Sequence, residues 1–191
     1  MNTELKIETH PWEPYIPPTP RILIMGTFPP KPARWSMDFY YPNKINDFWR
    51  IMGLIFFNDK TYLLNPDGNF NLDAIKKLLN DKGIAMNDTG KKIRRLKDNA
   101  SDKYLEIIHE TNLMSLLKKM PDCHVIASTG EKAASIIASQ TDTAMPKMGE
   151  MVISDSGLEI WRMPSTSRAY PLALEKKAEY YHRMFQHSGI I

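Results

Sequence analysis

The sequence Arg-Ile-Leu-Ile-Met-Gly at residues 21–26 decides the class of fold. Its four consecutive apolar residues end at a glycine, which is typical of a short strand buried on both faces. The segment 124–127 has the same character. Strands of this kind belong to parallel sheets that helices cover on each side. We therefore expect residues 21–25 to be the first central strand of such a sheet.

Segments with helical spacing alternate with these strands. A helix with an aromatic face is expected from Ile45 to Phe56, and a second over 71–82, whose first residue is an asparagine suited to N-capping. Further helices are expected over 105–119, over 131–139 and after Pro171.

Shorter apolar segments predict additional strands. One is expected over 84–86, and two more over 151–154 and 159–163 flank the turn Asp155-Ser156-Gly157 as a hairpin. Alternating strands and helices pack as layers around one sheet. The sequence therefore predicts an α/β protein, a three-layer α/β/α sandwich around a central, mostly parallel sheet.

The length and composition indicate a single folded domain. A chain of 191 residues with 42% hydrophobic and 25% charged residues is ordinary for a globular protein. Residues 11–20 contain five prolines, so we expect 1–20 to be an extended arm and 21–191 to be the domain. The net charge of +3 permits a polyanionic partner without requiring one.

Cysteine usage and hydropathy exclude several classes of protein. Cys123 is the only cysteine, so no intramolecular disulfide and no cysteine-ligated metal site can form. The histidines show no ligand spacing, so we expect no metal and no cofactor. No stretch approaches the roughly 20 apolar residues that span a bilayer, and the N-terminus lacks the apolar core of a signal peptide. We therefore expect a cytoplasmic protein that does not enter membranes.

Two segments place polar and aromatic residues just after predicted strands, where open α/β sheets bind their ligands. The first is Gly26-Thr27-Phe28-Pro29, followed by Phe39-Tyr40-Tyr41 and Asn46-Asp47-Phe48-Trp49. The second is Pro164-Ser165-Thr166-Ser167, between the last strand and the last helix. These residues are the first candidates for a functional site.

Together the two segments resemble the active-site motifs of the uracil-DNA glycosylase superfamily, in the order in which that family keeps them. The Gly-x-x-Pro turn, the aromatic cluster and the Asn before Phe-Trp resemble the mismatch-specific uracil and thymine glycosylases. Phe28 and Pro-Ser-Thr-Ser resemble the hypoxanthine-DNA glycosylase branch, as do the segments 83–85 and 129–133 and Asp88. The resemblance covers nearly the whole chain. It implies a monofunctional glycosylase that flips a deaminated base, hypoxanthine or uracil, out of DNA and hydrolyses its N-glycosidic bond.

This resemblance, together with the chemistry of base release, assigns roles to individual residues. The departing base gains negative charge, which the main-chain amides around Thr27 and Phe28 are suited to stabilise. Tyr41 is the candidate platform on which the base stacks. Better-known relatives position the attacking water with an Asn or Asp at the place of Phe28. Asn46, which the hypoxanthine branch is expected to use, is therefore the principal catalytic candidate, and Asp88 is the second.

The second segment resembles the loop that holds the DNA backbone beside the flipped nucleotide. Ser165, Thr166 and Ser167 offer hydroxyls and amides to phosphate oxygens, and Arg168 is suited to plug the duplex or to pair with a phosphate. Lys132, in the first turn of its predicted helix, is a further phosphate-binding candidate. The resemblance thus implies damaged or mismatched DNA as the partner, with a monomer as the default state.

Some features leave alternatives open. Phe28 and Met163 remove polar groups that most relatives use, so a protein that binds damaged nucleic acid without cleaving it is the alternative function. A hydrolase with Ser165 as nucleophile lacks a recognisable His and acid partner. The basic stretch 91–97 either follows the phosphate backbone or forms a solvated loop. Among the aromatic residues, Phe48 and Trp49 are expected in the core, because they begin the apolar face of the predicted helix.

Overall fold

The central sheet has five strands in the order β3-β2-β6-β8-β7 in the computed structural model, which describes residues 6–97 and 101–191. The strands are β2 (Ile22–Gly26), β3 (Ile84–Asp88), β6 (Val125–Thr129), β7 (Met151–Ile153) and β8 (Glu159–Met163). β3, β2, β6 and β8 run parallel, and β7 pairs antiparallel with β8. The predicted central strand and the predicted hairpin are both confirmed.

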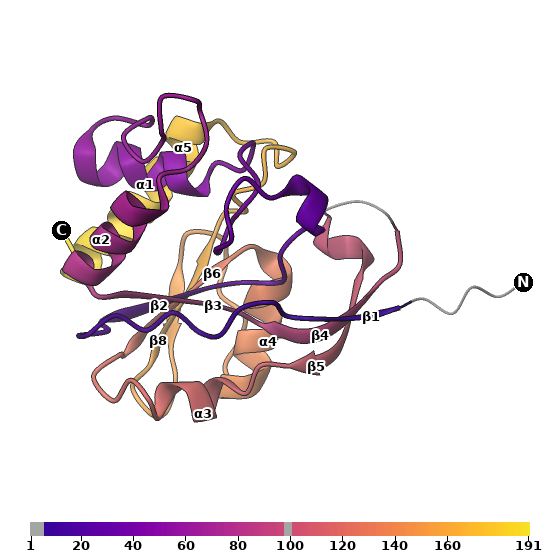
Figure 1. Cartoon of the computed structure of the whole chain (residues 1–191). Coiled ribbons are helices and arrows are strands. Elements are labelled where there is room, and N and C mark those ends of the chain that lie inside the picture. The colour runs from indigo at the N-terminus through magenta and orange to yellow at the C-terminus, as the bar shows by residue number, and fades with distance from the viewer. Residues whose placement is uncertain (1–5, 98–100) are drawn as a thin grey trace, which may run out of the picture.

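Helices cover both faces of this sheet, as Figure 1 shows. α1 (Phe48–Phe57), α2 (Leu72–Lys82) and α5 (Leu174–His187) lie on one side, and α3 (Leu113–Leu117) and α4 (Glu131–Thr141) lie on the other. Successive side chains of a strand point to opposite faces. Ile22 and Ile24 of β2 accordingly pack in the core beneath α1, α2 and α5. Leu23 and Met25 pack in the core beside α3 and α4, so the predicted three-layer α/β/α sandwich is confirmed.

Asparagine side chains mark where α1 and α2 begin. Oδ1 of Asn71 accepts a main-chain N–H of α2 at 3.0 Å, as predicted, and the helix ends at Gly83 with a left-handed φ of 68°. α1 begins at Phe48 rather than at Ile45. Its start is set by Asn46, whose Oδ1 accepts the N–H of Phe48 at 2.9 Å in a local turn.

A second sheet has three antiparallel strands in the order β1-β4-β5. The strands are β1 (Ile7–Thr9), β4 (Gly90–Arg95) and β5 (Leu105–Glu110). The predicted helix over 105–119 is therefore wrong, because its first part is β5 and only 113–117 is helical. Leu105 and Ile107 pair with residues of β4, so pairing with another strand overrides the local helical periodicity.

The N-terminal segment belongs to this second sheet. Residues 6–20 are largely extended, but β1 pairs with β4, and Tyr15 exchanges two main-chain hydrogen bonds of 2.9 Å with Met86 of β3. The segment therefore does not stand apart from the domain that was expected to begin at residue 21. It passes the end of β3 at Asp88, which His10 contacts, and then runs antiparallel to β3 toward the start of that strand, where the Arg21 N–H donates to the carbonyl oxygen of Gly83.

The helices formed by the described residues are all short. Two 3-10 helices, η1 (Pro32–Arg34) and η2 (Asp102–Tyr104), accompany the α-helices, of which α5 is the longest with 14 residues. None of them has the length and apolar character needed to cross a membrane.

Candidate active site

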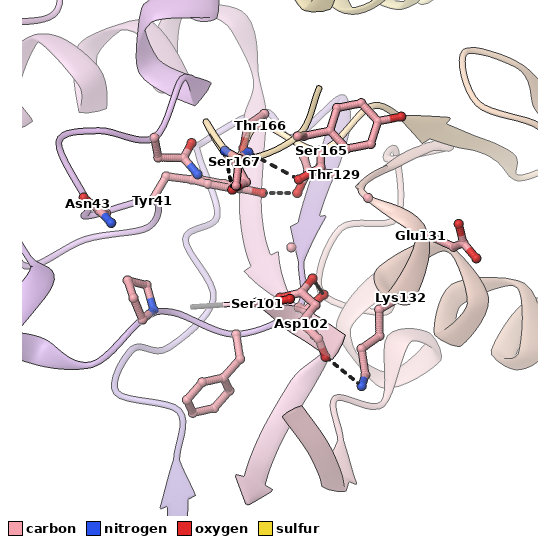
Figure 2. Close-up of a pocket in the computed structure, with 18 of the residues that line it drawn as sticks. Tyr41, Asn43, Ser101, Asp102, Thr129, Glu131, Lys132, Ser165, Thr166 and Ser167 are labelled. Atoms are coloured by element: carbon pink, nitrogen blue, oxygen red, sulfur yellow. Dashed lines mark hydrogen bonds between the residues drawn. The ribbon is translucent and has the colours of Figure 1, made fainter. Parts of the chain in front are cut away.

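A cavity of about 1040 Å³ opens at the carboxyl edge of the central sheet. The ends of β2, β3 and β6 meet there because these strands run parallel, and the segment that follows β8 joins them. Figure 2 shows Tyr41, Lys132 and the Ser165–Ser167 segment around the same space. Every residue predicted from the sequence to be catalytic, base-binding or DNA-binding lines this cavity: Thr27, Phe28, Tyr41, Asn46, Asp88, Lys132, Ser165, Thr166, Ser167 and Arg168.

Gly26 allows a carboxylate and a phenol to meet over the end of β2. A Cβ at this position would lie 2.6 Å from Asp88 Oδ1 and 3.0 Å from Tyr41 Oη. The first of these distances is too short for real atoms, so a larger residue would displace the Asp88 carboxylate. Gly26, at the end of β2, therefore leaves space for the side chains of Asp88 and Tyr41 to approach each other at the cavity.

Asp88 is bonded to His10, a residue not predicted to take part in a site. Asp88 is 6% exposed, and its Oδ2 lies 2.9 Å from His10 Nε2. His10 Nδ1 lies 2.9 Å from the carbonyl oxygen of Trp12 and 3.2 Å from the main-chain nitrogen of Trp12, so this ring nitrogen has both an acceptor and a donor beside it. Burial lowers the pKa of His10, but the hydrogen bond and the charge of Asp88 outweigh it, and the pKa lies above its ordinary value of 6.5. A histidine–carboxylate pair, in which His10 keeps its proton to a higher pH than a free imidazole, therefore lies at the edge of the cavity.

Tyr41 is held at both its ring and its hydroxyl. The ring stacks on Phe48 with the centroids 4.0 Å apart, and Oη lies 2.5 Å from Thr129 Oγ1 (Figure 2). Burial raises the pKa of Tyr41 well above 10.0, so the phenol stays protonated at neutral pH. Phe48 covers one ring face, which leaves at most one face for a base. Phe48 and Trp49 themselves are buried in the core, as predicted.

Asn46 lies partly buried in the turn before α1. Its Oδ1 accepts the N–H of Phe48, and its Nδ2 forms no hydrogen bond with any residue that the structure describes. A carbonyl oxygen has two lone pairs and the amide nitrogen two N–H groups. Asn46 can therefore accept a hydrogen bond from a water molecule while it donates to a second ligand group.

The turn after β2 is bonded to a carboxylate that was not predicted from the sequence. Thr27 Oγ1 donates to Asp102 Oδ2 at 2.6 Å. Burial raises the pKa of Asp102 above its ordinary value of 3.8, and the charge of Asp88 adds to this effect. Across residues 6–97 and 101–191, no hydrogen bond uses the main-chain amides of Thr27 and Phe28. These two donors are available to a ligand in the cavity.

Lys132 anchors a neighbouring segment. Its Nζ donates to the carbonyl oxygens of Asp102, at 3.0 Å, and of Leu105 (Figure 2). An ammonium group has three N–H donors, so one donor remains for a phosphate. The predicted DNA-binding role of Lys132 is thus restricted to a single remaining hydrogen bond.

The segment after β8 is joined to the turn before α1. Thr166 is buried, and its carbonyl oxygen accepts the N–H of Asp47 at 2.9 Å. Ser167 and Arg168 are exposed, and the Arg168 guanidinium donates to Asp47 Oδ1 at 3.1 Å. Asp47 Oδ2 accepts from Lys177 Nζ at 2.9 Å. Asp47 and Lys177 are not predicted from the sequence, although a lysine on the apolar face of the last helix is a usable signal.

The basic stretch 91–97 forms most of β4, so its interpretation as a solvated loop is wrong. Arg95 is buried and donates to both carboxylate oxygens of Glu8 at 3.0 Å and to the carbonyl oxygen of Pro29 at 3.1 Å. Arg95 therefore ties the turn after β2 to the N-terminal segment. Its guanidinium is used within the protein rather than offered to a phosphate.

The Ser165 hydroxyl lacks the partners of a catalytic nucleophile. Its Oγ accepts the N–H of Ser167 at 3.3 Å, and no His or carboxylate of the described chain is hydrogen-bonded to it. Within the described residues, no group of three or more His, Cys, Asp or Glu side chains could hold a metal ion. The residues around the cavity are instead arranged to offer hydrogen bonds, ring faces and fixed charges.

No family model matches the sequence, and no curated protein matches it. Among solved structures, the chain is similar to the "Solution NMR Structure of a putative Uracil DNA glycosylase from Methanosarcina acetivorans", with a TM-score of 0.68 and 19% sequence identity. The match covers 96% of this chain and 99% of that chain. The two proteins therefore share one fold, a mixed α/β fold with a central, mostly parallel sheet.

Proposed function

We propose that this protein is a DNA glycosylase of the uracil-DNA glycosylase superfamily, closest to its hypoxanthine branch. It hydrolyses the N-glycosidic bond of a deaminated base, and acts as a monomer in the cytoplasm. The observation that carries the proposal is the single cavity that collects all the residues chosen from two separate sequence motifs. The fold shared with the Methanosarcina protein, which is described as a "putative Uracil DNA glycosylase", supports the same class of activity.

The cavity is suited to a base that has left the DNA duplex. A base inside a duplex is out of reach, so the enzyme turns the nucleotide out of the stack and holds the base by stacking and by hydrogen bonds to its edge. The face of Tyr41 opposite Phe48 stacks on the base. The amides of Thr27 and Phe28 donate to it and stabilise the negative charge that it gains as the bond breaks. Ser165, Ser167 and Arg168 hold the neighbouring phosphates.

Asn46 positions the water that attacks the sugar. Its Oδ1 uses one lone pair for the N–H of Phe48 and keeps the other for the water. The carboxylate of Asp88, paired with His10, stabilises the positive charge that develops on the sugar. Lys132 is bonded to carbonyl oxygens, so the reaction proceeds by hydrolysis without a Schiff base at this lysine.

Hypoxanthine is the preferred base in this proposal. Met163, which stands where many relatives place a His or Asn, is 1% exposed and packs in the core. Its position therefore supplies no polar group to the edge of uracil. We expect uracil to be released more slowly than hypoxanthine, since one missing hydrogen bond to the base weakens transition-state binding.

The test is a base-release assay on four duplexes, which carry hypoxanthine, uracil, xanthine or a G·T mismatch. Alkali then cleaves the strand at each abasic site. We expect cleavage of the hypoxanthine duplex above the others. Cleavage of none of them would contradict the proposal, and salt-sensitive binding without base release would instead identify a protein that only recognises damaged DNA.

A further inference from the structure

Lys177 is a buried charge on the apolar face of α5. Its side chain is 1% exposed, although lysine is almost never buried without a partner. It lies on the same face of the helix as Ala178 and Tyr181, which belong to the hydrophobic core. We therefore expect the charge of Lys177 to have a function that an apolar residue at this position could not provide.

The Lys177 ammonium connects two segments that are far apart in the sequence. Nζ donates to Asp47 Oδ2 at 2.9 Å and to the carbonyl oxygen of Ser167 at 2.8 Å. Asp47 is itself bonded to the second segment twice more, through its main-chain N–H to Thr166 and through Oδ1 to Arg168. One buried ion pair thus lies at the junction of the turn before α1 and the segment 165–168.

The residue before Asp47 is Asn46, the proposed water-positioning residue. The Asn46 carbonyl oxygen accepts from the Arg50 guanidinium at 3.2 Å, and the Asn46 N–H donates to the carbonyl oxygen of Asn43 at 2.8 Å, so the main chain of Asn46 is bonded at both groups. Three cations, on Arg50, Lys177 and Arg168, surround the single carboxylate of Asp47. The excess positive charge lies where Arg168, 56% exposed, faces solvent and can meet a phosphate.

We propose that Lys177 and Asp47 are positioning residues, which set the place of Asn46 relative to the DNA-binding segment 165–168. This inference rests on the proposed glycosylase function. Residues 165–168 hold the DNA backbone and thereby set the position of the sugar. The ion pair between Lys177 and Asp47 sets the position of Asn46 and its water relative to that sugar. A shift of about 1 Å between such groups lowers a reaction rate by about 100-fold.

The test compares Lys177→Met with Lys176→Met. Lys176 is the neighbouring lysine on the exposed side of α5, paired only with Glu179. Single-turnover base release from the hypoxanthine duplex, the Kd for that duplex and hydrogen exchange of the Asp47 amide are measured below the unfolding temperature of each variant. We expect Lys177→Met to release the base at least about 10-fold more slowly, with Kd changed by less than about threefold and faster exchange at Asp47. Lys176→Met should resemble the wild type.

A double variant separates positioning from stability. Lys177→Met with Asp47→Asn removes both charges, so it should recover much of the stability lost in the single variant while base release stays slow. Recovery of the rate together with the stability would overturn the proposal, and so would a folded Lys177→Met with wild-type rate. If Lys177→Met does not fold, Lys177→Gln, which keeps a donor for Ser167, takes its place.

The two proposals fail in different ways. Absence of base release by the wild-type protein would refute the glycosylase function. Hydrogen exchange of the Asp47 amide would still test whether Lys177 holds the two segments together, because this N–H donates directly to the carbonyl oxygen of Thr166. Equal exchange of this amide in Lys177→Met and Lys176→Met would overturn the positioning role.

Discussion

Two of the buried ion pairs lie beside the cavity next to the predicted catalytic residues, one containing Asp88 and the other containing Asp47, the neighbour of Asn46. On one side His10 holds Asp88, with side chains 7% and 8% exposed. On the other, Lys177 holds Asp47, next to Asn46, with side chains 1% and 6% exposed. The two cations differ in chemistry, since the Lys177 ammonium donates to two acceptors, whereas the His10 ring is a group that titrates near physiological pH. The His10 side of the cavity is therefore expected to respond to pH.

The two pairs also attach different parts of the chain to the site. His10 comes from the N-terminal segment just after β1, and Lys177 comes from the last helix, α5. The Lys177 pair ties together two loops at the cavity. The His10 pair ties an edge strand to the end of β3. Loss of the Lys177 pair should therefore lower the free energy of unfolding more than loss of the His10 pair.

The largest effect is expected when the pair between Lys177 and Asp47 is broken. Lys177→Met leaves the buried carboxylate of Asp47 with only Arg168, and loss of one partner of a buried pair costs about 3–5 kcal/mol. The free energy of unfolding, measured in urea, should fall by an amount near the lower end of this range because Arg168 remains. Lys176→Met, in an exposed pair, should change it by less than about 0.5 kcal/mol. Equal urea midpoints for the two variants would show that the buried pair contributes nothing.

A smaller effect, and one that depends on pH, is expected at the other pair. His10→Gln removes the titratable charge but keeps an amide donor, so it should cost less than a full hydrogen bond to a charged group, which is worth about 1.5–3 kcal/mol. The pKa of His10 is raised above 6.5 in the folded protein, so its contribution is full below that pH and is lost as the pH rises through the folded-state pKa. The stability difference between wild type and His10→Gln should therefore shrink from pH 6 toward alkaline pH. A difference that stays constant or grows over this range would contradict the charged pair.

The smallest effect on stability is expected at Arg168, which lies half in solvent. Arg168→Ala should lower the free energy of unfolding by less than about 1 kcal/mol, because surface ion pairs contribute little. Its effect should appear in DNA binding instead. The slope of log K against log salt concentration should fall by about 1, the contribution of one phosphate contact. An unchanged slope would place the phosphates elsewhere.

Local sequence patterns predicted the parts of the molecule that depend on neighbouring residues. Short motifs and their positions account for the apolar run of β2, the Asn71 cap and the candidate site residues that line the cavity. The predicted helix over 105–119 failed because apolar spacing in Leu105–Glu110 suits a helix as well as an edge strand, and only the pairing with β4 decides between them.

Contacts between distant segments could not be predicted in the same way. His10 and Asp88 are 78 residues apart, and Asp47 and Lys177 are 130 residues apart. No spacing rule connects such residues, since their meeting depends on the path of the whole chain. A partial signal existed only for Lys177, a charged residue on an otherwise apolar helix face.

The most direct test of the proposed chemistry is single-turnover release of hypoxanthine from duplex DNA by Asn46→Ala, with Asn43→Ala as the matched control. Asn43 also lines the cavity, and its side chain accepts only from the main chain of Ile45. We predict that Asn46→Ala binds the duplex with a Kd close to that of the wild type but releases the base about 100- to 10,000-fold more slowly, as expected when a water-positioning group is lost. Asn43→Ala should keep most of the wild-type rate. Release of hypoxanthine by Asn46→Ala at the wild-type rate would contradict the assignment of this cavity's chemistry to Asn46.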